Sequence, residues 1–321
     1  MDSFEQLSMF GEDEVKDESA DKQPLSAQTG FGDALEQYLA YLKLDGSSPH
    51  TIKAFKSDLN LLGRWAGFDT PIGEFSTQTL NRFLHWMLTE RDKPCSPKTY
   101  ARRVTTLKHF FGYLHAQEAI RRDPSAGVIQ KSVTSPLPDI LLDAERERVL
   151  SVTQALRRHA EKPDARPHLL ITLLLDTGIK KSETMALTPE DIVRTNPNEP
   201  ILWVRYKNPK MRYKERKISI NPSWLVTLDE YLAQRKPEGV IFDCTARNLE
   251  YVLRDIARQA GVEQRKLSFE ALRWTCAYTD YVNGMDEEKL RQKLGLSRIS
   301  WRDTSARLEQ LREQIEGPRA S

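Results

Sequence analysis

The first candidate for chemistry in the sequence is Arg273, a basic residue inside an apolar run with helical spacing. Ser268 precedes this run and is a typical N-cap residue, so the pattern predicts a helix that begins just after it. A guanidinium on such a helix presents a planar fork of N–H donors that grips two oxygens of a phosphate. The alternative is an arginine that lies along the surface with its charge in water. We favour the phosphate contact because of the motifs around it.

The stretch 267–305 resembles the C-terminal half of the tyrosine recombinase (phage integrase) family. Members read roughly H-x-L-R-H-T, a helix, L-G-H-S, and then a helix that carries the nucleophilic tyrosine. The matching positions are Leu272, Arg273, Thr275, Leu294, Gly295 and Ser297. At the chemical positions Glu270 stands in place of the first histidine, and Trp274 and Leu296 replace the next two. Ser305 replaces the tyrosine.

A second stretch, T-G-I-K-K-S-E at 177–183, resembles the family motif T-G-x-R-x-x-E. Thr177, Gly178 and Glu183 match, and Lys180 takes the place of the arginine. A lysine pairs with a phosphate as a point charge but lacks the two-pronged grip. The resemblance therefore implies that phosphate binding survives this replacement better than catalysis does.

Cleavage by this family uses a tyrosine, a pair of arginines, histidines and a lysine on a β-hairpin. All six histidines of this chain precede residue 169, and its last tyrosine is Tyr281. We expect Tyr278 and Tyr281 to be core residues, and Ser305 has no nearby base to activate it. Loss of the nucleophile alone removes a factor of about 10⁶ in rate. The sequence thus predicts a pseudoenzyme with no catalytic residues. The alternatives are an active recombinase that uses Ser305 or a tyrosine from a partner subunit, and a protein-interaction scaffold.

The hydrophobic spacing predicts a mainly α-helical fold with a small β-hairpin or sheet. We expect an acidic disordered tail at 1–30, a helical domain at 31–131, a proline-rich linker at 132–139 and a mixed domain at 140–321. Strands are expected at 201–206 and 215–220. The resemblance implies a SAM-like core-binding domain followed by a domain with the recombinase catalytic fold. In the family, two such domains close around duplex DNA.

Two basic helical faces in the first domain are the candidates for DNA contact. The spacing leaves these cations away from the aromatic stripes that form the predicted core, and the set is Lys53, Lys56, Lys98, Arg102 and Arg103. In the second domain, Lys207 and Lys210 lie in the basic tip of the predicted hairpin. Either one matches the family's hairpin lysine, and the sequence does not choose between them.

The net charge of +2 conceals a strong asymmetry. Residues 1–25 hold eight acids and two lysines, a net charge of −6, so the rest of the chain is +8. This balance favours double-stranded DNA as the partner of the body. Within the tail, Gln6, Leu7, Met9 and Phe10 form an apolar island that resembles the sliding-clamp-binding consensus Q-L-[SD]-L-F. The alternative is a tail that masks the DNA groove of its own chain.

Other features bound the class of protein. Cys95, Cys244 and Cys276 lack metal-type spacing, which favours small core residues in a reduced, cytoplasmic compartment. No apolar run approaches the ~20 residues of a membrane helix. We therefore expect a nucleoid-associated protein without a metal, cofactor or membrane partner. Its other expected partner is a second copy or a related recombinase on DNA.

Overall fold

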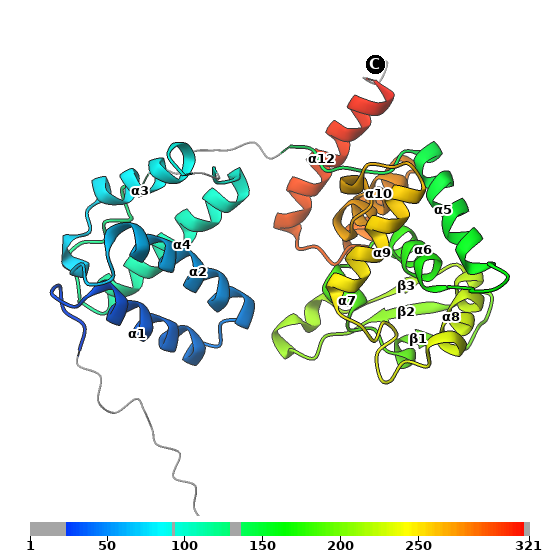
Figure 1. Ribbon diagram of the computed structural model, residues 1–321, viewed down its shortest axis with the longest axis horizontal. Coiled ribbons are helices and arrows are strands. Elements are labelled where there is room, and N and C mark those ends of the chain that lie inside the picture. The colour runs from blue at the N-terminus through cyan, green and yellow to red at the C-terminus, as the bar shows by residue number, and fades with distance from the viewer. Residues whose placement is uncertain (1–23, 92–93, 129–135, 318–321) are drawn as a thin grey trace, which may run out of the picture. The chain divides into compact units, whose positions relative to one another are not determined.

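The computed structural model describes residues 24–91, 94–128 and 136–317. The chain divides into two compact units, Met1–Ser135 and Pro136–Ser321, and each is described by itself. Both units are mainly helical, and the described part of the second holds a small antiparallel sheet (Figure 1). The predicted fold class is confirmed. The four segments expected from the sequence, with their boundaries, stay predictions.

The helices of the first unit begin at residues that are typical helix caps. Serine side chains at positions 48, 76 and 96 accept hydrogen bonds from the first turns of three helices, and proline follows two of these caps. The helices are α1 (Phe31–Leu44), α2 (Pro49–Ala66), α3 (Thr77–Thr89) and α4 (Pro97–Ala116), with a 3₁₀ turn η1 (Ile72–Glu74) before α3.

Aromatic side chains fill the core of this unit, as the helical stripes predicted. Phe31 contacts Phe75 and Phe110 with ring centroids 5.4 Å apart in each case, and Tyr38 meets Phe110 at 5.2 Å. The Phe31, Tyr38 and Phe110 side chains are fully buried. Burial on this scale, at about 25 cal/mol per Å² of apolar surface, holds the helices together.

In the second unit α6 (Arg166–Thr177) is the central helix. It packs against α5 (Asp143–Arg157), α8 (Pro222–Arg235), α9 (Ala246–Gln259) and α10 (Phe269–Val282) (Figure 1). Leu169, Leu170, Ile171, Leu173 and Leu174 have no exposed surface, so more than half of the circumference of this helix is apolar and buried. The remaining elements are α7 (Lys181–Thr184), α11 (Glu287–Lys293), α12 (Arg298–Glu316), η2 (Pro189–Asp191), η3 (Pro209–Lys214) and η4 (Gln264–Lys266).

The sheet has the strand order β1 (Ile192–Val193), β2 (Ile201–Val204), β3 (Arg216–Ser219), and both pairs are antiparallel. The predicted strands are confirmed but shorter. The reason at one end is that the Tyr206 N–H donates to the Glu215 side chain, 2.9 Å away, instead of joining the ladder. The strand β1 was missed because two residues are too short for any alternation to be read.

A separate small core fixes the C-terminal helices. Trp301 and Leu308 of α12 pack with Leu290 of α11 and with Tyr278 of α10. Cys276 is buried, Cys95 and Cys244 are half-buried, and all three thiols are free. None of the helices in the described ranges is long and apolar enough to cross a membrane.

Candidate nucleic-acid interface

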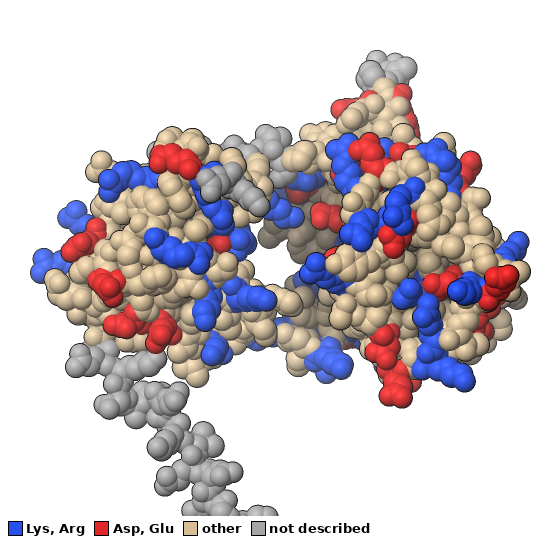
Figure 2. All heavy atoms as spheres, viewed as in Figure 1, with Lys and Arg blue, Asp and Glu red and all other residues tan. Residues whose placement is uncertain are grey.

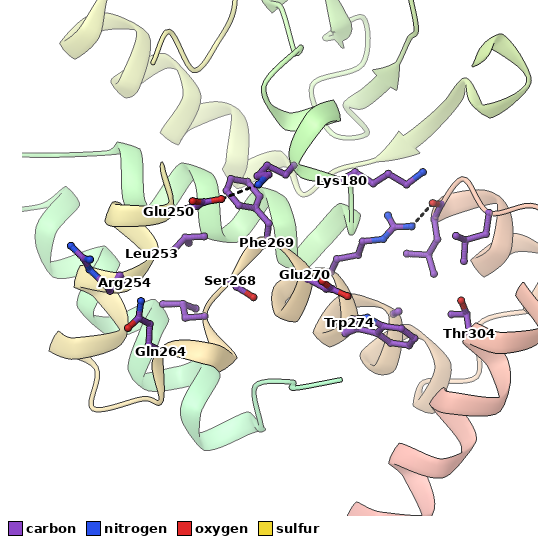
Figure 3. A pocket seen from close by; sticks show the side chains of 16 residues that line it. Lys180, Glu250, Leu253, Arg254, Gln264, Ser268, Phe269, Glu270, Trp274 and Thr304 are labelled. Atoms are coloured by element: carbon purple, nitrogen blue, oxygen red, sulfur yellow. Dashed lines mark hydrogen bonds and ion pairs between the residues drawn. The ribbon is translucent and has the colours of Figure 1, made fainter. Parts of the chain in front are cut away.

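A pocket of about 660 Å³ opens on the second unit, around the N-terminal half of α10. Figure 3 shows Leu253 and Arg254 reaching it from α9, Trp274 from α10 and Thr304 from α12. The pocket also includes Lys180, so it joins both sequence motifs that resembled the recombinase family. The complete lining is Lys180, Lys181, Glu250, Leu253, Arg254, Gln264, Leu267, Ser268, Phe269, Glu270, Arg273, Trp274, Ala277, Leu294, Leu296 and Thr304.

Arg273 lines this pocket on α10, whose N-cap is Ser268 as predicted. Its guanidinium donates to two main-chain carbonyls, that of Gly178 and that of Leu294, the latter at 2.6 Å. Burial lowers the pKa of Arg273 from its usual value. The carbonyls orient the guanidinium without adding a negative charge, so its positive charge is available to an anion.

Gly178 makes this arrangement sterically possible. It ends α6 in the left-handed region with φ +59°, where only glycine is unstrained. A Cβ at this position would lie 3.0 Å from Leu294 Cδ2 and 3.2 Å from Cys276 Sγ. The T-G pair of the motif therefore sets the approach of α6 to α10 and to the turn at 294–296.

Lys180 follows this turn as the N-cap residue of α7. Its N–H donates to Glu183 at 2.8 Å, and its Nζ lies 3.9 Å from the Glu183 Oε1. Burial lowers the pKa of Lys180, and the charges of Arg273, Lys214 and Arg216 lower it further, against the opposing effect of Glu183. Several cations thus converge where the pocket meets α7.

A buried pair of charges that the sequence did not reveal supports this end of the pocket. Arg216 of β3 donates to both oxygens of Glu183, at 3.0 and 2.8 Å, and its Nε donates to the Lys293 carbonyl at 2.6 Å. Burial by itself would raise the pKa of Glu183, but the hydrogen bonds and charge of Arg216 lower it to about 2. The Tyr206 hydroxyl also donates to Glu183. This pair ties the sheet to α7 and α11.

The positions where the family has histidines are in the pocket but carry other groups. Glu270, Trp274 and Leu296 all line it, as the resemblance implied. On α12, however, the residue that lines the pocket is Thr304 and not Ser305. The Thr304 hydroxyl donates to the Ser300 carbonyl at 2.9 Å, and the Ser305 hydroxyl donates to the Arg302 carbonyl at 3.3 Å. Both are bonded within their own helix.

The two tyrosines near the end of α10, Tyr278 and Tyr281, are not among the residues that line the pocket. Tyr278 donates to Glu316 at 3.3 Å, and Tyr281 donates to Glu309. Both carboxylates belong to α12, so these phenols join the two helices. Their predicted role as packing residues agrees with these contacts.

The hairpin lysines remain an open choice. Lys207 and Lys210 are exposed in the β2–β3 connection, and neither is among the residues that line the pocket. Lys214, which the sequence did not single out, is the hairpin lysine whose charge acts on Lys180. A 3₁₀ turn, η3, had no clear signal in the sequence and brings Lys214 to this place.

In the first unit the candidate cations fall into two groups. Lys53, Lys56 and Lys98 are exposed on α2 and α4. Arg102 and Arg103 instead bind a buried carboxylate, Asp58, at 2.7 and 3.2 Å. The Arg103 side chain is only 12% exposed, against 40% for Arg102. Figure 2 shows lysine and arginine side chains on the visible face of each unit, with acidic side chains among them.

Two further expectations concern the tail and metals. Gln6, Leu7, Met9 and Phe10 lie outside the described residues. Within the ranges that the structure describes, His, Cys, Asp and Glu side chains form no group of three or more that could hold a metal ion.

Two family models match the chain. The model described as "Phage integrase, N-terminal SAM-like domain" matches residues 35–118, and "Phage integrase family" matches residues 144–304. Among curated proteins, tyrosine recombinase XerC of Caldanaerobacter subterraneus subsp. tengcongensis is 26% identical over 319 residues, which cover 88% of this chain and 85% of that protein. Tyrosine recombinase XerD of Proteus mirabilis is 27% identical over 281 residues, covering 83% and 85%.

Solved structures share the fold. The XerH site-specific recombinase bound to palindromic difH substrate, a post-cleavage complex, matches with a TM-score of 0.72 at 17% identity, covering 92% of this chain and 99% of that one. The Tn1549 transposon integrase in complex with circular intermediate DNA matches with a TM-score of 0.67 at 19% identity, covering 88% and 98%.

These comparisons overturn the prediction of a pseudoenzyme. The curated relatives match most of this chain and are named tyrosine recombinases, which are enzymes. The prediction was wrong because it inferred a loss of activity from the histidines and the tyrosine that are missing from the C-terminal part of this chain. Glu270, Leu296 and Ser305 do replace two histidines and the tyrosine of the family, but these replacements alone do not show that the protein is inactive.

Proposed function

Because this chain belongs to the phage integrase family, we propose that it binds duplex DNA with both units and acts in site-specific DNA recombination at the chromosome. The observation that carries the proposal is the pocket in which Arg273 and Lys180 meet. A backbone phosphate there receives hydrogen bonds from the guanidinium and a point charge from the lysine.

The balance of charge in the pocket supports an anion. Its lining holds four cations and two carboxylates, and one of those carboxylates, Glu250, is already bound to Lys181 at 2.9 Å. The guanidinium of Arg273 donates to two backbone carbonyls, which carry no negative charge of their own. A phosphodiester needs such a cationic site both to bind and to reach the transition state of cleavage.

For strand cleavage, we propose that a related recombinase bound to the same DNA supplies the tyrosine. Thr304 and Ser305 are engaged within α12, and the lining of the pocket contains neither a tyrosine nor a histidine among the described residues. In the step, the incoming phenol loses its proton as its oxygen bonds to phosphorus, the bond from phosphorus to the 5′ oxygen breaks, and that oxygen takes up one proton, so that no net proton is gained or lost. Arg273 and Lys180 stabilise the charge on the remaining phosphate oxygens.

The test of DNA binding is a salt titration of the full chain with labelled duplex DNA. Each phosphate that the protein neutralises adds ~0.9 to the slope of log K against log salt. Arg273→Ala and Lys180→Ala are expected to weaken binding and reduce the slope. Arg194→Ala is the matched control, because Arg194 pairs with Asp229 on the surface and does not line the pocket. A DNA affinity that does not change with salt concentration would contradict the proposal.

The test of cleavage uses a nicked duplex that traps covalent protein–DNA adducts. This chain is incubated with a tyrosine recombinase encoded in the same genome. We expect an adduct on the partner that depends on Arg273 and survives Ser305→Ala. An adduct on this chain that Ser305→Ala abolishes would contradict the partner's role and assign the nucleophile to the serine. An adduct indifferent to Arg273 would contradict the role of the pocket.

We also propose that Gln6, Leu7, Met9 and Phe10 bind the replication sliding clamp. The support is in the sequence, where these residues form an apolar island in an acidic stretch. Short motifs that order on binding reach only modest affinity, in the ~micromolar range. A peptide of residues 1–14 is expected to bind purified clamp, and Gln6→Ala with Phe10→Ala is expected to abolish binding. Absence of binding by the unmodified peptide would contradict this proposal.

A further inference from the structure

A second pocket, of about 730 Å³, lies on the first unit along α3 and has no part in the phosphate site. We call it the α3 groove. Two tryptophans, Trp65 of α2 and Trp86 of α3, line it together with six polar or charged residues. The lining is Trp65, Thr77, Gln78, Asn81, Arg82, His85, Trp86 and Glu90.

The two indoles are held in place by the core. Phe83, which is buried, lies with its ring centroid 5.6 Å from Trp65 and 6.1 Å from Trp86, and it stacks on Trp86 at 21°. Both tryptophans are half-buried, so each leaves part of its ring at the surface. Fixed, partly exposed tryptophans in a concave site are the usual anchors of a protein or peptide contact.

The chain enters this unit close to one end of the groove. Leu25 packs on the same core, and Ala27 lies 2.8 Å from where a Cβ on Gly73 would be. Thr77, which opens α3 and lines the groove, follows four residues after Gly73. Phe10 precedes the first described residue, Pro24, by fourteen residues. An extended chain of that length spans roughly 46 Å, more than twice the ~20 Å of α3.

The charges of the groove and the N-terminal segment are opposite. Arg82 and His85 line the groove together with a single carboxylate, Glu90. The segment 1–25 carries a net charge of −6, with Glu5 on one side of the apolar island and Glu12 on the other. An acidic segment with three apolar side chains therefore matches an apolar groove that has a basic side.

We propose that the α3 groove binds the chain's own segment Gln6–Phe10. Leu7, Met9 and Phe10 contact the indoles of Trp65 and Trp86, and the flanking acids face Arg82. The tether supplies an effective concentration of the order of ~mM, so a groove that binds the free peptide with a Kd near ~0.1 mM is mostly occupied. The docked segment cannot bind the clamp at the same time. The proposal does not depend on the phosphate site or on clamp binding.

The experiment uses the full chain with its tryptophans labelled with ¹⁵N, so that each of the six indoles gives one NMR signal. Replacing Leu7, Met9 and Phe10 together by serine is expected to shift the signals of Trp65 and Trp86 and to leave that of Trp224 in place. Trp224 is buried in the other unit and shows whether a change at the groove stays confined to the first unit. Val15→Ser, an apolar change in the same segment but outside the island, is the control and is expected to shift neither signal.

Substitution of the groove gives the reciprocal test. Arg82→Glu, at an exposed position, is expected to reproduce the shifts of Trp65 and Trp86 seen with the triple serine variant. If the triple variant moves neither signal, or moves all six equally, the proposal fails. The shifts are also expected to be independent of protein concentration. Loss of the docked signals on dilution would overturn the proposal, because it would assign the groove to the tail of a second copy.

Discussion

Arginines occupy two contrasting environments in this protein. In the first unit, Arg103 donates to Asp58, a carboxylate that is only 4% exposed. The Nη1 of Arg103 also donates to the sulfur atoms of Met87 and Cys95. In the second unit, Arg273 donates only to backbone carbonyls. Asp58, which Arg103 shares with Arg102, offsets part of the charge of Arg103, whereas the groups that accept hydrogen bonds from Arg273 carry no negative charge. Equal basic residues in a sequence are therefore unequal candidates for binding a phosphate.

Arg216 belongs with Arg103, since it is paired with a buried acid. We therefore expect substitutions at acid-paired arginines and at carbonyl-held arginines to have different effects. Changes at acid-paired arginines or at their acids affect stability first. Changes at carbonyl-held arginines affect DNA binding first.

The largest effect is expected from Glu183→Ala. It leaves Arg216, whose side chain is 7% exposed, buried without its counter-ion. Breaking a buried pair from one side typically costs about 3–5 kcal/mol. Urea unfolding of the second unit measures the loss, with Glu250→Ala as the control, because Glu250 forms a half-exposed pair with Lys181. Equal losses in the two variants would remove the distinction between buried and exposed pairs.

A nearly equal effect is expected from acid. The pKa of Glu183 is about 2 in the folded protein against 4.5 for the free group. A lowered pKa contributes stability that is complete above pH 4.5 and is lost as the pH falls through 2. The difference of about 2.5 pKa units corresponds to roughly 3 kcal/mol. We expect the stability of the wild-type chain relative to Glu183→Gln to fall by that amount between pH 6 and pH 2. A constant difference would contradict the lowered pKa.

A smaller effect, and the sharpest test of the comparison, comes from paired conservative changes. Arg273→Lys removes the fork and is expected to weaken DNA binding by roughly tenfold, or about 1.4 kcal/mol. Arg103→Lys is expected to lower the free energy of unfolding by about 1–2 kcal/mol while DNA affinity stays within about twofold. Fluorescence anisotropy and urea unfolding on both variants test the separation. The reverse pattern would mean that burial by an acid does not exclude DNA contact.

The smallest effect is expected from the exposed lysines of the first unit. Lys98→Ala removes one cation from the predicted DNA-binding face, without a change in the core. The slope of log K against log salt is expected to fall by ~0.9 if Lys98 neutralises one phosphate. Lys43→Ala, at the C-terminal end of α1, is the control and is expected to leave the slope unchanged. Equal slopes for the two variants would remove Lys98 from the interface.

Local signals in the sequence predicted most of this architecture. A serine or a serine-proline pair marks the start of several helices, and Ser268 fixes the start of the helix that carries Arg273. These signals work because a cap satisfies N–H groups within its own turn. The T-G turn and Lys180 were found in a different way, through the resemblance of residues 177–183 to the family motif.

The contacts that distinguish the arginines could not be predicted from such local signals. Asp58 and Arg103 are 45 residues apart, and Glu183 and Arg216 are 33 apart, so no local pattern relates them. Tyr206 was missed for the same reason. Whether Thr304 or Ser305 lines the pocket depends on the rotation of α12 about its axis, because adjacent residues of a helix point about 100° apart. That rotation is fixed by packing and not by the residues themselves.

The carbonyls of Gly178 and Leu294 have one more consequence. A carboxylate that orients an arginine is protonated in acid, and the ion pair is then lost. A backbone carbonyl does not titrate in the pH range in which the protein stays folded. The direction of the Arg273 side chain is thus insensitive to acidity. In the proposed contact with a phosphate, competing ions are therefore expected to matter more than protons, so the contact should weaken as the salt concentration rises.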